Sequence, residues 1–321
     1  MDPLIQVLIP TYERPEYLKE ALESVFRQTY TNYRILISDD GKTDRTEKML
    51  HEFFPYNPKI DYRRNPQFND DTKPYYYAQN KNFLYLKQNM YDEAKYIQWL
   101  MDDDLFYPDK FEKMVAAYEQ YPDVTLVTSF RHTFGDKYRY ANQLTDTLTL
   151  HDGYKFGREE ITNMVGYCGA PTTVLIKKST LTHLELGWGR DEGEYIIVDF
   201  PRFFDLLSRG NLIYFPQPLS AMRSHPGRDT NQSDTPFRAR ICWLINLRYA
   251  INNKIFLDDL ESQKKALLSW LQIALKLEKE HRSANYSSVM FSRFQKLIPH
   301  VFEAVKTDCK LDLDPILFPK E

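Results

Sequence analysis

The first part of the chain alternates short apolar runs with amphipathic segments of helical period. The run "LIQVLIP" at 4–10 predicts a strand, and apolar residues then recur at three- and four-residue steps over 18–26, which predicts a helix. "NYRILISDDG" at 32–41 repeats the strand pattern, and "TDRTEKMLHEFF" at 43–54 repeats the helical one. The beginning of the chain therefore predicts two consecutive β-α units.

The same alternation continues as far as Phe130. Further strands are predicted at 59–64, 95–101 and 123–130, and helices at 78–94 and 108–121. Strands that alternate with helices are typical of a mainly parallel sheet with helices on both faces. We therefore expect the α/β class, with a Rossmann-like sheet.

Beyond this point the pattern changes twice. Residues 131–168 are polar and aromatic with weak periodicity, and the polar stretch 223–236 predicts a loop. We expect two domains: an α/β domain over 1–235, with halves at 1–130 and 131–235, and a helical region over 236–321. The remaining predicted elements are strands at 172–178 and 211–216, a helix at 200–209 ended by Gly210, and helices at 237–253, 259–280 and 286–305.

Composition excludes several classes of protein. With 42% hydrophobic and 27% charged residues among 321, the chain has enough apolar material for a core. A formal net charge of -3 argues against nonspecific nucleic-acid binding. Three widely spaced cysteines make neither a disulfide framework nor a zinc pattern, so we expect a cytoplasmic protein. We also expect no signal peptide and no transmembrane segment, which leaves peripheral membrane contact open.

Polar residues follow three of the predicted strands. These are the stretches 10–14 ("PTYER"), 39–41 ("DDG") and 102–104 ("DDD"). Ligands of open α/β sheets bind at the carboxyl ends of the strands, and clustered carboxylates repel one another unless a cation or hydrogen-bond donors lie between them. Turn chemistry explains 39–41 equally well. A helix cap explains one aspartate of 102–104 but not three.

Carboxylates at a sheet edge favour a hard divalent cation, which commonly shares its coordination with substrate phosphates. The glycine-rich routes to phosphate are absent from the sequence, since it contains neither GxxxxGK[ST] nor GxGxxG and has only 11 glycines. These residues therefore predict an enzyme that uses Mn²⁺ or Mg²⁺ and acts on a nucleoside-diphosphate-like ligand.

An ordered set of motifs carries a resemblance to a known family. "VLIPTYERPEYLKEALESVFRQTYTNYRILISDDGKTD" is followed, after some 60 residues, by "YIQWLMDDDLFYPDKFEKM". The pair resembles the nucleotide-sugar half of inverting family-2 glycosyltransferases with the type-A (GT-A) fold, over about residues 4–235. The resemblance implies a nucleotide-sugar half at 1–130, an acceptor half at 131–235, a UDP-linked donor and a carbohydrate or glycolipid acceptor. It also implies a role in bacterial surface polysaccharide or glycoconjugate synthesis.

The resemblance implies roles for single residues. The common family motif is D-x-D-D, and Met101 stands where its first aspartate often lies, so the assignment among the three aspartates stays open. A basic residue before the fourth strand would contact the base or phosphates, and either Lys81 or Lys87 would serve. The expected nucleotide-binding residues are Pro10, Thr11, Tyr12, Arg14, Asp40, Lys81 and Asp102, and the expected metal ligands are Asp103, Asp104 and His225.

The resemblance also implies a catalytic base that lies well after the acidic motif, at the start of a helix. Asp199 fits, although an ordinary N-cap fits the same position. Asp191, Glu192 and Glu194 are its rivals. The loop residues Arg223 and Arg228 would close over the diphosphate, with a solvated linker as the alternative reading of that loop. The expected acceptor contacts are Trp188, Asp191 and Glu192.

Two other functions are also compatible with the sequence. A sugar nucleotidyltransferase shares the alternation and the acidic ligands, but usually carries a glycine-rich first loop, and "IPTYERPEYL" has no glycine. A noncatalytic sugar-binding protein of the same fold would tolerate the loss of its metal ligands. We expect the C-terminal helices to support the acceptor site or an oligomer.

Overall fold

The computed structural model describes residues 2–69, 75–136, 143–181, 199–227 and 233–317. Two compact units make up the chain, and neither is continuous in sequence. Unit 1 consists of Met1–Asp152, Tyr167–Glu185 and Arg209–His225, and unit 2 of Gly153–Gly166, Leu186–Ser208 and Pro226–Glu321.

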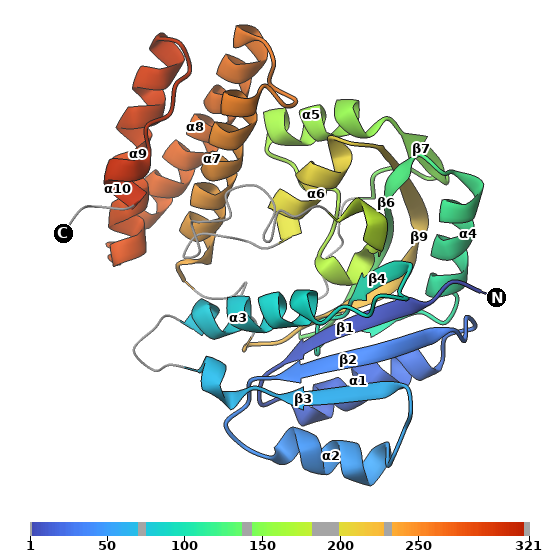
Figure 1. Cartoon of the computed structure of the whole chain (residues 1–321). Coiled ribbons are helices and arrows are strands. Elements are labelled where there is room, and N and C mark those ends of the chain that lie inside the picture. The colour runs from blue at the N-terminus through green and yellow to red at the C-terminus, as the bar shows by residue number, and fades with distance from the viewer. Residues whose placement is uncertain (1, 70–74, 137–142, 182–198, 228–232, 318–321) are drawn as a thin grey trace. The chain divides into compact units, whose positions relative to one another are not determined.

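Unit 1 is built on one mixed sheet, in which nine strands lie within the described residues (Figure 1). The order is β3-β2-β1-β4-β8-β6-β9-β5, and β7 pairs with β9. The first four strands are mutually parallel, whereas β8 is antiparallel to both of its neighbours. The strands are β1 (Ile5–Thr11), β2 (Tyr33–Asp39), β3 (Ile60–Arg64), β4 (Tyr96–Trp99), β5 (Leu105–Phe106), β6 (Val124–Gly135), β7 (Thr149–His151), β8 (Leu175–Lys177) and β9 (Asn211–Ser224).

Apolar residues on both sides of this sheet explain its two helical layers. Successive side chains of a strand point to opposite faces. Val7 and Ile9 of β1 therefore lie in the same hydrophobic core as Leu18 and Leu22 of α1. On the other face, α3 packs the ring of Phe83 against Trp99, with centroids 4.8 Å apart. The helices of unit 1 are α1 (Pro15–Phe26), α2 (Arg45–Phe53), α3 (Tyr75–Gln88) and α4 (Lys110–Gln120), with 3₁₀ turns η1 (Pro66–Phe68), η2 (Pro171–Thr173) and η3 (Lys178–Thr180).

Two local expectations for unit 1 were wrong. The predicted loop at 223–236 is shorter, because β9 continues to Ser224 through parallel pairing with β6, where Gly135 faces Ser224. Backbone hydrogen bonds hold that strand regardless of its polar side chains. The predicted strand at 172–178 begins as the 3₁₀ turn η2, and only Leu175–Lys177 is strand.

Unit 2 is helical. The ring of Phe237 on α7 packs against Phe291 and Phe294 of α9, with centroids 4.8 and 5.3 Å away. Helix α5 was not expected, and its Gly157 lies so close to Phe256 that a Cβ would approach the ring to 2.4 Å. The helices are α5 (Gly153–Asn163), α6 (Asp199–Leu207), α7 (Thr235–Asn253), α8 (Leu260–Ser283), α9 (Val289–Lys306) and α10 (Asp314–Leu317).

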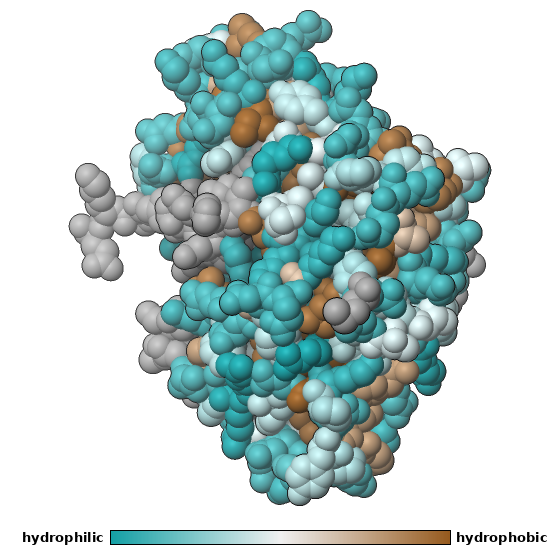
Figure 2. Space-filling view, turned by 45° about the vertical axis from the view of Figure 1, so that its right-hand side comes forward, coloured by the Kyte–Doolittle hydropathy of each residue, from teal (hydrophilic) through white to brown (hydrophobic). Residues whose placement is uncertain are grey.

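The two units do not coincide with the two contiguous domains, 1–235 and 236–321, that the sequence predicts. Helices α5 and α6 belong to unit 2 together with the C-terminal helices, because the ring of Phe204 on α6 packs against Trp243 of α7. Among the residues that the structure describes, none of the helices combines the length and apolar composition needed to cross a bilayer. The face drawn in Figure 2 is mainly hydrophilic, with hydrophobic residues scattered over it.

Candidate functional site

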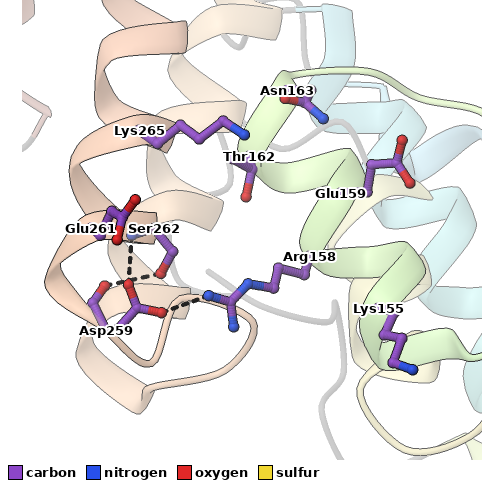
Figure 3. Close-up of a pocket in the computed structure, with 9 residues that line it drawn as sticks. All are labelled: Lys155, Arg158, Glu159, Thr162, Asn163, Asp259, Glu261, Ser262 and Lys265. Carbon is purple, nitrogen blue, oxygen red and sulfur yellow. Dashed lines mark hydrogen bonds and ion pairs between the residues drawn. The ribbon is translucent and has the colours of Figure 1, made fainter.

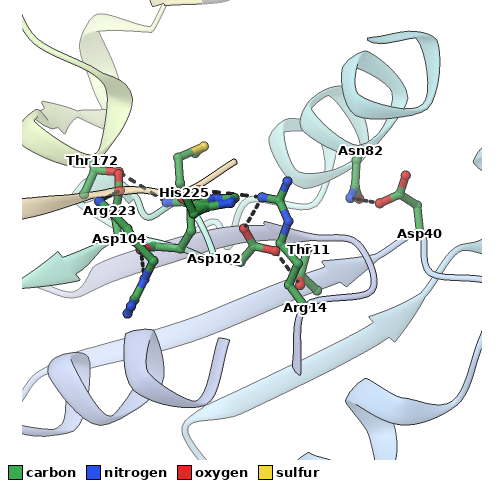
Figure 4. Close-up of polar contacts among 11 residues, drawn as sticks. Thr11, Arg14, Asp40, Asn82, Asp102, Asp104, Thr172, Arg223 and His225 are labelled. Carbon is green, nitrogen blue, oxygen red and sulfur yellow. Dashed lines mark hydrogen bonds and ion pairs between the residues drawn. The ribbon is translucent and has the colours of Figure 1, made fainter. Parts of the chain in front are cut away.

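The acidic turn that follows β4 is buried, although it carries three adjacent carboxylates. Asp102, Asp103 and Asp104 expose only 6%, 7% and 1% of their surface. Burying a charge is costly unless it is paired or hydrogen-bonded. Each of the three carboxylates accordingly has its own partners, all within unit 1. Figure 4 labels Asp102 and Asp104 with their partners Thr11 and Thr172.

Asp102 is held by the loop that follows β1. The Thr11 hydroxyl donates to Asp102 Oδ2 at 2.9 Å, and Arg14 Nη1 lies 3.4 Å from Asp102 Oδ1. Burial and the neighbouring Asp103 charge raise the pKa of Asp102, whereas Arg14 and the Thr11 hydrogen bond lower it. The turn after β4 and the loop after β1 thus form one polar edge, because β1 and β4 are adjacent parallel strands.

Asp103 faces a histidine from the far end of β9. Asp103 Oδ2 lies 2.9 Å from His225 Nε2, and Arg14 Nη1 lies 3.6 Å from the same oxygen. The ring of Tyr17 packs against His225 with centroids 5.1 Å apart. A carboxylate oxygen and an imidazole nitrogen are both common ligands of divalent transition metals. This pair fits a cation as two of its ligands.

The described residues contain no group of three His, Cys, Asp or Glu side chains that could hold a metal ion. A cation at the Asp103–His225 pair would therefore take its remaining ligands from substrate phosphates and water, as magnesium usually does.

Asp104 has a different set of partners. The Thr172 hydroxyl donates to Asp104 Oδ2 at 2.7 Å, and the backbone N–H of Arg223 donates to Oδ1 at 3.1 Å. Both oxygens are thereby engaged in joining the acidic turn to η2 and β9. Metal ligation by Asp104 stays a prediction, and its contacts give it a clear role in positioning the turn.

Arg223 also serves the acidic turn. Its Nε donates to the carbonyl oxygen of Asp103 at 3.1 Å, while its Nη2 lies 2.5 Å from Glu20 Oε2. The guanidinium carbon lies 4.5 Å from the ring centroids of both Tyr17 and Phe134. Arg223 therefore links β9 to the turn and to α1. The diphosphate contact expected of this side chain stays a prediction.

The two aspartates at the end of β2 have different hydrogen-bond partners. Asp39 accepts hydrogen bonds from the Gly41 N–H at 2.7 Å and from the Tyr62 hydroxyl at 2.8 Å, which is turn chemistry. Asp40 accepts from Asn82 Nδ2 at 2.8 Å. Burial, with a further contribution from the Asp39 charge, raises the pKa of Asp40 to about 7, although the hydrogen bond from Asn82 lowers it. A buried carboxyl with a perturbed pKa at a sheet edge is a candidate ligand contact.

The structure brings together seven of the residues expected from sequence, namely Thr11, Arg14, Asp102, Asp103, Asp104, Arg223 and His225. Pro10 and Tyr12 flank Thr11, and Tyr12 is 44% exposed. Lys81 is exposed on α3, beside Asn82 in sequence. Asp199 is the first residue of α6, in unit 2. Its side chain lies outside the described residues, as do Trp188, Asp191, Glu192, Glu194 and Arg228.

Two residues of the site were missed from sequence. Asn82 lies on the buried face of α3, one helical turn from Ala78 and from Leu86, and is only 2% exposed. An amide within an apolar helical stripe is a signal that could have identified it. Thr172 gave no such signal, because its contact with Asp104 spans 68 positions of the chain.

Unit 2 contains a separate hollow of about 480 Å³ between α5 and α8 (Figure 3). Its lining is charged but balanced, since Arg158 pairs with both Asp258 and Asp259 at 2.8 and 2.5 Å. Three basic and three acidic side chains line it, so no net charge favours a diphosphate there. These residues are Lys155, Arg158, Lys265, Glu159, Asp259 and Glu261.

Curated relatives share part of the chain with this protein. An uncharacterized glycosyltransferase of Rickettsia typhi is 33% identical over 117 residues, which is 35% of this chain and 31% of that protein. TuaG of Bacillus subtilis, named for teichuronic acid biosynthesis, is 27% identical over 113 residues, covering 35% of this chain and 41% of TuaG. The matches thus span less than half the length of either relative.

Solved structures share the fold at low sequence identity. S. aureus TarS 1-349 in complex with UDP-GlcNAc matches with a TM-score of 0.58 and 11% identity, over 94% of this chain and 90% of that one. The mannosyltransferase PcManGT of Pyrobaculum calidifontis, in complex with GDP-Man and Mn²⁺, matches with a TM-score of 0.52 and 13% identity, over 100% and 89%. Both matches support the expected GT-A fold.

The family match covers more than half of the chain. The model of glycosyl transferase family 2 matches residues 6–184, which include β1, the acidic turn and η2. Because this match covers more than half of the chain, the protein belongs to glycosyl transferase family 2, and it has the GT-A fold.

Proposed function

We propose that the protein is a metal-dependent, inverting glycosyltransferase, which transfers a sugar from a UDP-linked donor to an acceptor hydroxyl of a carbohydrate or glycolipid. One observation carries the proposal: Thr11, Arg14, Asp102, Asp103 and His225 converge on one edge of the sheet, beside the end of β2. The UDP-GlcNAc complex of TarS and the name of TuaG support a UDP donor and a role in surface polysaccharide synthesis.

The nucleoside would occupy the edge formed by β1, β2 and β4. Asp40 has the chemistry to accept the ring N–H of uracil, and Asn82 orients it through the 2.8 Å hydrogen bond. Asp102 would accept from a ribose hydroxyl, because Thr11 and Arg14 already fix its orientation. Pre-orientation of these carboxylates lowers the entropic cost of binding the nucleoside.

Asp103 and His225 would hold the cation, and Arg14 lies close enough to Asp103 to share in the binding of phosphate charge. A bound divalent cation would stabilise the charge that develops on the departing diphosphate. The hydrogen bonds from Arg223 and Thr172 fix the acidic turn, so that Asp103 is held in place before substrate arrives.

We assign the general base to Asp199, the first residue of α6. In a single displacement the acceptor oxygen forms a bond to the anomeric carbon while the bond from that carbon to the UDP oxygen breaks. The acceptor proton passes to the Asp199 carboxylate, and UDP leaves. The configuration at the anomeric carbon is thereby inverted.

Binding and turnover test the two halves of this proposal separately. Calorimetric titration with UDP-, dTDP-, GDP- and CDP-sugars, with and without Mn²⁺, should show the tightest binding for the UDP-sugar with metal. Asp103→Asn should abolish the benefit of Mn²⁺ and lower turnover by about a hundredfold or more. Equal binding of all four nucleotides, or no effect of Mn²⁺ on the wild type, would contradict the assignment of donor or metal.

The base assignment needs its own variant. Asp199→Asn should lower kcat by about 10²–10⁴-fold and leave the affinity for UDP within about twofold, because the residue acts only on the acceptor proton. Asp205→Asn, on the same helix, provides the matched control and should retain turnover. Normal turnover in Asp199→Asn would overturn the assignment.

A further inference from the structure

The charge of the chain is unevenly distributed. The segment 236–321 carries fourteen Lys and Arg against ten Asp and Glu, whereas the whole chain has a formal charge of -3. This excess of four positive charges makes the segment the place to look for a surface that binds an anionic partner. Helices α8 to α10 and all of α7 beyond Thr235 lie in this segment, and they are therefore the helices to consider for such a surface.

Helix α8 has one face packed in unit 2 and an opposite face exposed. Ala266, Leu267, Trp270 and Leu271 are buried, and Trp270 Nε1 donates to the carbonyl oxygen of Arg240 on α7 at 2.8 Å. The opposite face carries side chains at steps of three and four residues, which places them in one row. We call this row the α8 stripe: Lys265, Leu268, Gln272, Leu275, Lys276 and Lys279.

The α8 stripe combines exposed apolar and cationic side chains. Leu268 and Leu275 are 45% and 42% exposed, and Leu268 and Gln272 line an open hollow of about 800 Å³. Glu261 precedes the stripe by one helical turn and lines the same hollow, so three lysines face one acidic side chain along this row. Leucines between lysines, on one face of a long helix, are the arrangement by which amphipathic helices lie in an anionic lipid surface.

We propose that the α8 stripe docks unit 2 on an anionic membrane surface. The leucines would enter the headgroup boundary, and the lysine stems would extend along them while their ammonium groups contact lipid phosphates. A second copy of the chain is a poorer occupant, because two cationic stripes repel each other. The inference does not depend on the donor or the metal proposed above, since it concerns a helix that carries none of those residues.

Vesicle co-sedimentation of the full chain tests this inference. The protein should bind phosphatidylcholine vesicles that contain about 30% phosphatidylglycerol, and not phosphatidylcholine alone, with binding that weakens as salt is raised. The triple variant Lys265→Glu, Lys276→Glu, Lys279→Glu should lose more than about a hundredfold in partition coefficient, at roughly fivefold or more for each lysine. Leu268→Ser with Leu275→Ser should lose about tenfold.

A second triple variant separates the stripe from net charge. Lys254→Glu, Lys306→Glu and Lys310→Glu change the total charge equally at other positions of the same segment. We expect this control to keep vesicle binding within about fivefold of the wild type, because only distant surface charge is altered. Equal losses in the two triple variants, no binding of the wild type to anionic vesicles, or self-association through the stripe in light scattering would each overturn the inference.

Discussion

Replacing Asp40 with asparagine should stabilise the protein at neutral and alkaline pH and weaken nucleotide binding at the same time. Asp40 is 4% exposed, and its burial raises its pKa from the ordinary 3.8 to about 7. Between about pH 4 and pH 7 the folded protein therefore holds a proton that the unfolded chain has released. Stability falls as the pH rises through this window, and the full cost is present above about pH 7.

The size of this effect follows from the two pKa values. Each pKa unit is worth 1.36 kcal/mol, so the difference between 3.8 and about 7 corresponds to an upper value of about 4 kcal/mol above pH 7. Asparagine carries no charge to bury and keeps an oxygen that can accept from Asn82. We expect Asp40→Asn to recover about 2–4 kcal/mol at pH 8 and little near pH 4. The affinity for UDP should fall about tenfold, since a charged acceptor becomes a neutral one.

Urea denaturation at several pH values between about 4.5 and 8 measures the stability difference between Asp40→Asn and wild type. Asp61→Asn is a matched control of opposite sign, because the hydrogen bond from Arg63 lowers the pKa of Asp61. Its ionised form is the favoured one, so the asparagine variant should be less stable than wild type at pH 8. An Asp40→Asn gain that does not change with pH would refute the reasoning.

Three further variants test other parts of the structure. Asn82→Ala removes a donor to Asp40, so UDP affinity should fall about tenfold or more in calorimetry, whereas Asn89→Ala on the same segment should not change it. Gly157→Ala places a Cβ 2.4 Å from the Phe256 ring and should cost about 1–3 kcal/mol in urea denaturation. Lys110 is fully buried and its pKa lies well below its usual range because of burial, so the unfolded chain binds its proton more readily. Lys110→Met should therefore gain more stability at pH 6 than at pH 9.

The local pattern of apolar and polar residues was sufficient to predict much of the secondary structure of unit 1. Apolar runs and helical periods predicted β1, α1, β2 and α2 within a few residues, because each is stabilised by a face of its own sequence. Helix α5 was not predicted from the sequence. It begins at Gly153 and contains Gly157, and glycines have a low helix propensity. The glycine at 157 is explained only by the Phe256 ring on a distant segment.

The sequence alone determined which strand ends are acidic and that parallel neighbours would bring them to one edge. Tertiary structure decided which carboxylate faces which partner. Asp103 meets His225 across 122 positions, and Asp104 is held by Thr172 and by the backbone of Arg223. No local pattern encodes such contacts, because they depend on the order of β4, β8, β6 and β9 in the folded sheet. Adjacent aspartates with the same side chain thus acquire different partners only after the strands have paired.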